Sequence, residues 1–219
     1  MPRSSFTHEF KSPINRIRGL VQILCTDQQL NAHDRAAIQG LVDVNTTRLQ
    51  RSSESLLLHT FWNEYSLVKE HIDTAQLDTV VKACTERNRI GLDTEIRAES
   101  HAGASICALD IAAWEMAIDH LINNALKFGG HAPVDVFLRI ETDEILFRIK
   151  DRGPGMANVT QATEAFWQAS EGLSREKNGL GLGLSLAHRI AEAHGGMLSL
   201  SSQPGDGFEA ILRIPNSIE

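Results

Sequence analysis

The sequence predicts an α+β protein in which a helical hairpin, expected to form a dimeric four-helix bundle, precedes an α/β sandwich. Two observations support this prediction. Near the N-terminus, apolar residues recur at alternating steps of four and three, which is the spacing of a helical bundle seam. The remainder alternates helical periodicity with short runs of period two, which is typical of a sheet covered by helices. The expected domains are residues 1–68 and 69–219.

The hairpin follows from these steps. The apolar positions of its first helix are Phe10, Ile14, Ile17, Val21 and Leu24. The same spacing recurs from residue 38 to residue 59, and the polar segment 25–35 is short enough to join two antiparallel helices. A two-helix hairpin buries too little apolar surface to be stable alone, so we expect a homodimer. The alternative is that both helices pack on the rest of the same chain.

The second half begins near residues 66–74, where the residue pattern changes. Because helices then alternate with runs of strands, one mixed sheet covered by helices is expected. The expected elements are a helix at 77–89, strands at 92–99 and 104–110, a helix at 111–128, strands at 134–142 and 145–151, a helix at 182–194, and strands at 197–202 and 208–215.

Composition excludes several classes of protein. The formal net charge of −7 argues against a broad nucleic-acid or anionic-membrane surface. Three cysteines without CxxC spacing argue against a disulfide framework or a zinc site. No apolar run approaches the roughly 18 to 20 residues of a membrane span. A cytoplasmic fragment that contacts neither nucleic acid nor membrane is therefore expected.

The stretch FTHEFKSPI, residues 6–14, places a titratable pair and a proline inside a predicted helix. On that helix His8 points away from the apolar seam, with Ser12 one turn further along the same face. A neutral imidazole is a competent nucleophile near pH 7, and the carboxylate of Glu9 can take the proton that is released. Pro13 removes a helical N–H, so the helix should bend or loosen there. An exposed histidine without a role is the alternative.

Glycines and polar residues gather in three stretches of the second half. These stretches are HLINNALKFG at 120–129, DRGPGM at 151–156 and NGLGLGLSLAHRIAEAHGG at 178–196. Bare backbone N–H groups at a glycine-rich helix start can receive phosphates. Taken singly, the stretches also fit a helix C-terminus, a turn and close packing.

In order and spacing, the three stretches resemble the ATP-binding sandwich shared by histidine kinases and their Hsp90-like ATPase relatives. HEFKSP resembles the histidine box of the kinases alone, in its His-Glu-x-x-Thr/Ser-Pro form. From Phe6 to Pro215 the chain is therefore similar to the dimerisation and catalytic core of a two-component sensor histidine kinase. The resemblance implies ATP and Mg²⁺ as cofactors, autophosphorylation of His8, and transfer to an aspartate on a response-regulator receiver domain. The full-length parent is expected to carry an upstream sensor and a possible membrane anchor.

The resemblance also implies site residues. Asn124 would hold Mg²⁺ and phosphates through its amide oxygen, with Lys127 one turn on. Asp151 would accept the adenine amino group, and Ser12 would orient the water that dephosphorylates the regulator. Phe166 would anchor a lid formed by residues 156–178, in which Arg175 and Lys177 are either phosphate contacts or solvated charges. The glycines expected to let the backbone approach the nucleotide are Gly153, Gly155, Gly179, Gly181 and Gly183.

One position departs from the family's pattern. His120 stands four residues before Asn124, where the family usually has a second asparagine, and nitrogen is a poorer Mg²⁺ ligand than oxygen. His120 could still contact metal or phosphate, but the efficiency of catalysis is in question. A second function therefore stays open: a degenerate kinase that acts as a dimeric nucleotide-binding module regulating other kinases. A plain ATPase, such as a chaperone or repair protein, is a third, against which the histidine box argues.

Overall fold

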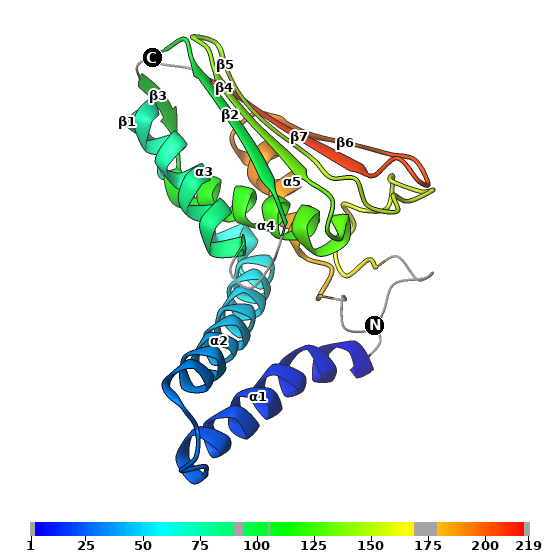
Figure 1. The fold of residues 1–219 in the computed structure, drawn as a ribbon. Coiled ribbons are helices and arrows are strands. Elements are labelled where there is room, and N and C mark those ends of the chain that lie inside the picture. The colour runs from blue at the N-terminus through cyan, green and yellow to red at the C-terminus, as the bar shows by residue number, and fades with distance from the viewer. Residues whose placement is uncertain (1–2, 90–93, 105, 169–178, 217–219) are drawn as a thin grey trace.

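The protein consists of a helical hairpin and an α/β domain in the computed structural model, which describes residues 3–89, 94–104, 106–168 and 179–216. Figure 1 shows the hairpin reaching away from the sheet and its covering helices. The elements are α1 Arg3–Thr26, α2 Ala32–Thr60, the short 3₁₀ helix η1 Trp62–Glu64, β1 Glu70–Asp73, α3 Thr74–Arg89, β2 Ile96–Ala102, β3 Ile106–Leu109, α4 Ile111–Gly129, β4 Val134–Ile140, β5 Glu144–Lys150, α5 Gly183–Ala193, β6 Met197–Ser202 and β7 Phe208–Pro215. The predicted α+β fold is confirmed.

The hairpin forms as its residue pattern predicts. Asn31 caps α2, because its side chain accepts the N–H of Asp34 at 2.8 Å. Helix α1 continues through Pro13, so the loosening expected at this proline does not break the helix. The side chain of Pro13 is buried. Within one chain the seam is only partly covered: Ile14 is 50% exposed and Val21 is 42% exposed. The hairpin alone therefore leaves apolar surface in water.

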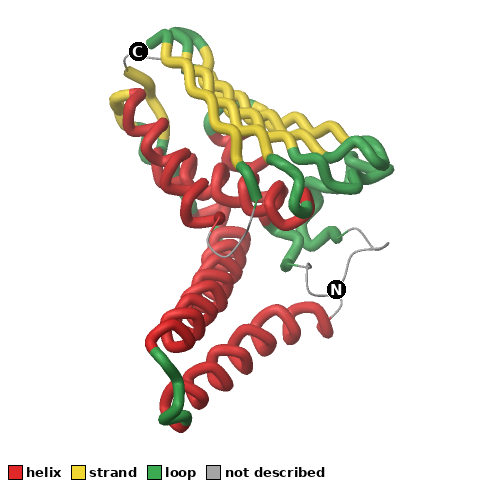
Figure 2. Tube along the Cα trace, in the orientation of Figure 1, coloured by secondary structure: helices red, strands yellow, loops and turns green. Residues whose placement is uncertain are grey.

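The main sheet has the order β2-β4-β5-β7-β6, with β2 parallel to β4 and the other pairs antiparallel. Residues of β4 alternate between buried and more exposed positions, and Figure 2 shows the helices on one face of this sheet. β1 and β3 instead form a separate antiparallel pair, with Ile72 opposite Cys107. The expectation of one sheet was wrong here, because β1 lies in the segment taken as the domain boundary and pairs with β3.

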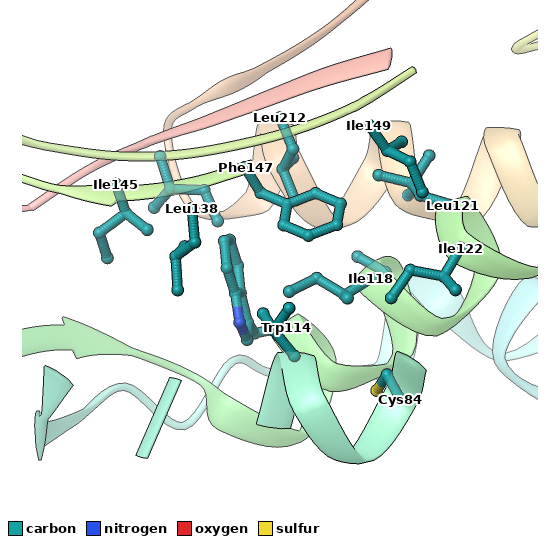
Figure 3. Close-up of a cluster of buried hydrophobic side chains, with 14 of the residues drawn as sticks. Cys84, Trp114, Ile118, Leu121, Ile122, Leu138, Ile145, Phe147, Ile149 and Leu212 are labelled. Carbon is teal, nitrogen blue, oxygen red and sulfur yellow. The ribbon is translucent and has the colours of Figure 1, made fainter. Parts of the chain in front are cut away.

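A buried core fixes α4 against the sheet. Trp114 of α4 and Phe147 of β5 are both fully buried, with ring centroids 6.3 Å apart at 81°, an edge-to-face arrangement. Figure 3 shows Ile118 and Ile122 of α4 in the same cluster. Because α4 is anchored by these side chains, its C-terminal half is held at a fixed height above the sheet.

The segment between the two domains is tied to the α/β domain. Asp110 caps α4 by accepting the N–H of Ala113 at 3.0 Å through Oδ1. Its other oxygen accepts the hydroxyl of Tyr65 and the N–H of Val68, both at 3.0 Å. The segment that follows the hairpin is therefore hydrogen-bonded to the residue that caps the start of α4.

Candidate phosphotransfer site

The C-terminal half of α4 faces the glycine-rich segment. Asn124 is half-buried there, and a Cβ atom at Gly179 would lie 3.2 Å from Nζ of Lys127. That ammonium lies 5.0 Å from the centroid of the Phe128 ring. Burial lowers the pKa of Lys127 to about 8, while the negative charge of Glu9 opposes this shift. The structure thus brings Lys127 beside the glycine segment, and its charge interacts with that of Glu9 on the first helix of the hairpin.

Asp151 follows β5 directly and is 2% exposed. Its Oδ1 accepts the N–H of Gly153 at 2.8 Å and that of Phe208 at 3.2 Å. Burial raises the pKa of this carboxyl, although the two N–H groups act in the opposite direction. Because both bonds use Oδ1, Oδ2 keeps its acceptor capacity, which suits an exocyclic amino group.

Two glycines of the second stretch permit close backbone packing. A Cβ atom at Gly153 would collide with the carbonyl oxygen of Phe128, and one at Gly155 would collide with that of Gln203. Gly155 also has a φ of +64°, a conformation that side chains rarely adopt. The backbone that follows Asp151 therefore packs closely, at Gly153, against the end of α4.

The described part of the predicted lid is attached to the glycine segment. The N–H of Phe166 donates to the carbonyl of Gly181 at 2.9 Å, and Nε2 of Gln168 donates to that of Gly179 at 2.6 Å. Phe166 and Gly181 both have positive φ, +66° and +70°. The Phe166 ring meets His59 of α2 edge-on, with centroids 5.1 Å apart. The lid's first part thus touches the hairpin as well.

The rest of the predicted lid lies outside the described residues. Arg175 and Lys177 belong to that part of the chain. Gly183 begins α5, so the glycine segment leads directly into a helix N-terminus, as predicted.

His120 contacts the hairpin. Its Nε2 lies 3.1 Å from Oγ of Ser55 on α2. Because the Ser55 hydroxyl donates to the carbonyl of Arg51 at 2.7 Å, its oxygen accepts from His120, which places the ring proton on Nε2. The His120 ring also borders Gly183, where a Cβ atom would lie 3.4 Å from Nδ1. The predicted role of His120 toward metal or phosphate therefore depends on Nδ1.

Sequence reasoning did not identify Asp119, which joins three helices. Asp119 is 6% exposed and accepts Nε of Arg51 on α2 at 2.7 Å. From α3 it accepts Nη2 of Arg87 and Nδ2 of Asn88, both at 2.8 Å. A buried carboxylate requires such partners. The only signal in the sequence is an acidic residue within the apolar stretch AIDHLI.

Glu9 is held by an arginine of the second helix. The residue as a whole is 7% exposed, and Arg48 donates to its carboxylate from Nε at 3.1 Å and from Nη2 at 2.9 Å and 3.1 Å. Ser12 is half-buried on α1, one turn along. His8 belongs to α1, but its side chain lies outside the described part of the structure. The immediate neighbour of the proposed nucleophile is thus buried and paired with an arginine of α2.

The described residues contain no group of three or more His, Cys, Asp or Glu side chains that could hold a metal ion. None of the described helices is long and apolar enough to cross a bilayer. A groove of about 600 Å³ between α3 and β2 includes none of the predicted site residues.

Comparison with known proteins yields one family model and many relatives. Residues 109–218 match the model described as histidine kinase-, DNA gyrase B-, and HSP90-like ATPase. The chain is 28% identical to the signal transduction histidine-protein kinase AfsQ2 of Streptomyces coelicolor, over 97% of this chain and 41% of AfsQ2. It is also 28% identical to the sensor-type histidine kinase PrrB of Mycobacterium tuberculosis, over 95% of this chain and 46% of PrrB. The chain thus spans less than half the length of these relatives.

Solved structures share the fold. The Acinetobacter baumannii histidine kinase AdeS superposes with a TM-score of 0.63 at 20% identity, over 96% of this chain and 98% of that one. Full-length ShkA in complex with AMPPNP has a TM-score of 0.63 at 23% identity, over 97% of this chain and 45% of ShkA. Both the hairpin and the α/β domain fall within the aligned length.

Proposed function

The chain belongs to the family of histidine kinase-, DNA gyrase B- and HSP90-like ATPases, and from this premise we propose that it is the core of a two-component sensor histidine kinase. It would bind ATP, phosphorylate itself on His8 and pass the phosphoryl group to an aspartate of a response-regulator receiver domain. The names of its relatives support this function. One observation carries the proposal: Phe166 binds the glycine segment through its N–H to Gly181 and meets His59 of the hairpin edge-on at 5.1 Å, so the nucleotide half and the hairpin are in contact.

The nucleotide half offers a donor and acceptor set that fits ATP. Oδ2 of Asp151 is suited to the adenine amino group. The backbone between Gly179 and Gly183 ends in a helix N-terminus, which favours phosphate oxygens. Asn124 offers an amide oxygen to Mg²⁺, which when bound neutralises charge on the transferred phosphoryl group. Lys127 adds a positive charge at the same end of α4.

The chemistry at the hairpin is a nucleophilic attack with proton removal. One nitrogen of the His8 ring takes the phosphoryl group while Glu9 accepts the proton from the other. Ser12, one turn along the same helix, is suited to orient water for dephosphorylating the regulator. The cytoplasmic location expected from the sequence agrees with this use of ATP.

A homodimer is part of the proposal. The large apolar side chains left exposed on α1 and α2 include Ile14, Val21, Ile23, Leu41 and Val44, each between 41% and 51% exposed. Packing against a second hairpin would remove this surface from water. Sedimentation equilibrium tests this directly, because Val21→Glu with Leu41→Glu should convert the dimer to monomer.

Labelling with [γ-³²P]ATP and Mg²⁺ tests the central step. The wild-type chain should acquire acid-labile, base-stable label, and His8→Gln should abolish it while leaving ATP binding intact. Label that persists in His8→Gln would show that the nucleophile is a different residue. ATP binding without any label would instead favour the degenerate kinase that regulates other kinases. Sustained phosphate release without phosphohistidine would favour a plain ATPase.

A further inference from the structure

The carboxylate of Glu9 is enclosed, and a side chain outside the proposed mechanism holds it. Arg48 of α2 is 39 residues away in the chain, yet its guanidinium makes three contacts with the two oxygens of Glu9. The Glu9 side chain is 9% exposed, whereas that of Arg48 is 36% exposed. The cation therefore reaches inward from the surface to the buried anion.

The three contacts are unequal between the two oxygens. Oε1 accepts Nε at 3.1 Å and Nη2 at 2.9 Å, while Oε2 accepts only Nη2, at 3.1 Å. A carboxylate offers about four acceptor sites, two on each oxygen. Oε1 is therefore filled, and Oε2 keeps a site for one more donor. A planar guanidinium also fixes the carboxylate's orientation, which a single ammonium could not do.

A second cation, contributed by the α/β domain, also acts on this group. The charge of Glu9 raises the pKa of Lys127 on α4, whereas that of Arg48 lowers it. Glu9 therefore interacts with one cation from α2, through direct contacts, and with one from α4, through its charge.

We propose that Arg48 is a positioning residue for the phosphorylation of His8, holding Glu9 so that Oε2 accepts the proton from the His8 ring. This inference rests on the proposed function. An N–P bond forms between one ring nitrogen and the phosphoryl group, and the P–O bond to ADP breaks with its electron pair leaving on ADP. The proton on the other ring nitrogen passes to Oε2. Arg48 exchanges no proton in this step and acts on it through Glu9.

A purely structural pair would behave differently. If Arg48 only joined α1 to α2, its removal would slow phosphorylation whether or not Glu9 could accept a proton. If Arg48 acts through Glu9, its removal has no further effect once Glu9 is replaced by glutamine. A small guanidinium compound should also restore activity only in a variant that lacks Arg48 but keeps the Glu9 carboxylate to bind it.

The experiment measures initial rates of acid-labile labelling in five chains: the wild type, Arg48→Ala, Arg48→Lys, Glu9→Gln, and Glu9→Gln with Arg48→Ala. Arg18→Ala, which removes an exposed arginine of α1, is the matched control. Each rate is measured over a range of ATP concentrations, with and without methylguanidinium. Circular dichroism checks that the helices are intact, and Arg48→Lys, which keeps the charge but loses the planar fork, serves if Arg48→Ala does not fold.

Arg48→Ala is expected to lower kcat about tenfold or more with KM for ATP nearly unchanged, because a misplaced proton acceptor costs part of its usual 10²- to 10⁴-fold contribution. Methylguanidinium should restore labelling in Arg48→Ala but not in the double variant, and Arg48→Lys should be intermediate. Equal losses from Arg48→Ala with and without Glu9 would overturn the inference, as would a wild-type rate in Arg48→Ala. A wild-type chain that takes no label would overturn the proposed function itself, which separates the two failures.

Discussion

Acid should destabilise this protein through His120. The pKa of His120 is lowered from 6.5 to about 4, mainly because burial disfavours the charged ring. Arg51 adds to the shift, and the carboxylate of Asp119 opposes it. The neutral ring also donates its Nε2 proton to Ser55, as argued above. The folded protein therefore resists protonation of this side chain between pH 6.5 and 4.

The sign and size of the effect follow from linkage. Because the pKa is lower in the folded state, the unfolded chain binds the proton first as the pH falls. The stability associated with neutral His120 is therefore complete above pH 6.5 and is lost progressively as the pH falls toward 4. At about 1.4 kcal/mol per pKa unit, the loss between pH 7 and pH 4.5 is about 2 to 3 kcal/mol of unfolding free energy.

Urea unfolding of the wild type and His120→Gln, at pH 7 and at pH 4.5, measures this contribution. Glutamine can still donate to Ser55 but does not titrate, so other groups that titrate contribute equally to both chains and cancel. The wild type should lose about 2 to 3 kcal/mol more than the variant on acidification. His33→Gln, which removes an exposed histidine of α2, should behave as the wild type. Equal losses in the wild type and His120→Gln would refute the reasoning.

Three further predictions concern nucleotide binding, backbone geometry and the direction of transfer. Asp151→Asn should weaken ATP binding about tenfold or more in an equilibrium titration, because an amide N–H would face the adenine amino group. Gly207→Ala should destabilise the fold by about 1 to 3 kcal/mol in thermal melts, because φ at Gly207 is +76° and a Cβ atom there would collide with the Asp151 carbonyl oxygen. The control Gly40→Ala lies in open space on α2 and should stabilise the fold slightly. Because α2 of the hairpin contacts its own chain's nucleotide half through Ser55 and His59, mixed dimers of His8→Gln and Asn124→Ala should take no label, and label in such dimers would indicate transfer between subunits.

The fold was largely predictable because its elements have strong local patterns. Period-two alternation located the strands of the main sheet, and the four-three steps located α1 and α2. The relatives likewise confirm the resemblance to sensor histidine kinases that the motifs indicated. β1 was missed because four residues, of which only Ile72 is buried, carry too little pattern to identify a strand. Its existence depends on pairing with β3, more than thirty residues away.

The predicted glycines and Asp151 were identifiable for a similar reason: each motif is contiguous, and its chemistry is local. The partners that the structure adds are not local. Arg48 lies 39 residues from Glu9, Arg51 lies 68 residues from Asp119, and Ser55 lies 65 residues from His120. The first pair depends on how α1 packs on α2, and the other two depend on how the hairpin docks on the α/β domain. No single stretch of sequence records that docking.

These long-range contacts also account for the departure at position 120. An imidazole is longer than the amide that the family usually has there, and its Nε2 reaches Ser55 on the hairpin while Nδ1 stays beside Gly183. The position therefore joins α2 to the start of α5. Asp119, the preceding residue, is paired with Arg51 of the same helix α2. A movement of α2 relative to α4 would break both contacts together, so the orientation of the hairpin and the shape of the proposed nucleotide site are physically coupled at these two adjacent residues.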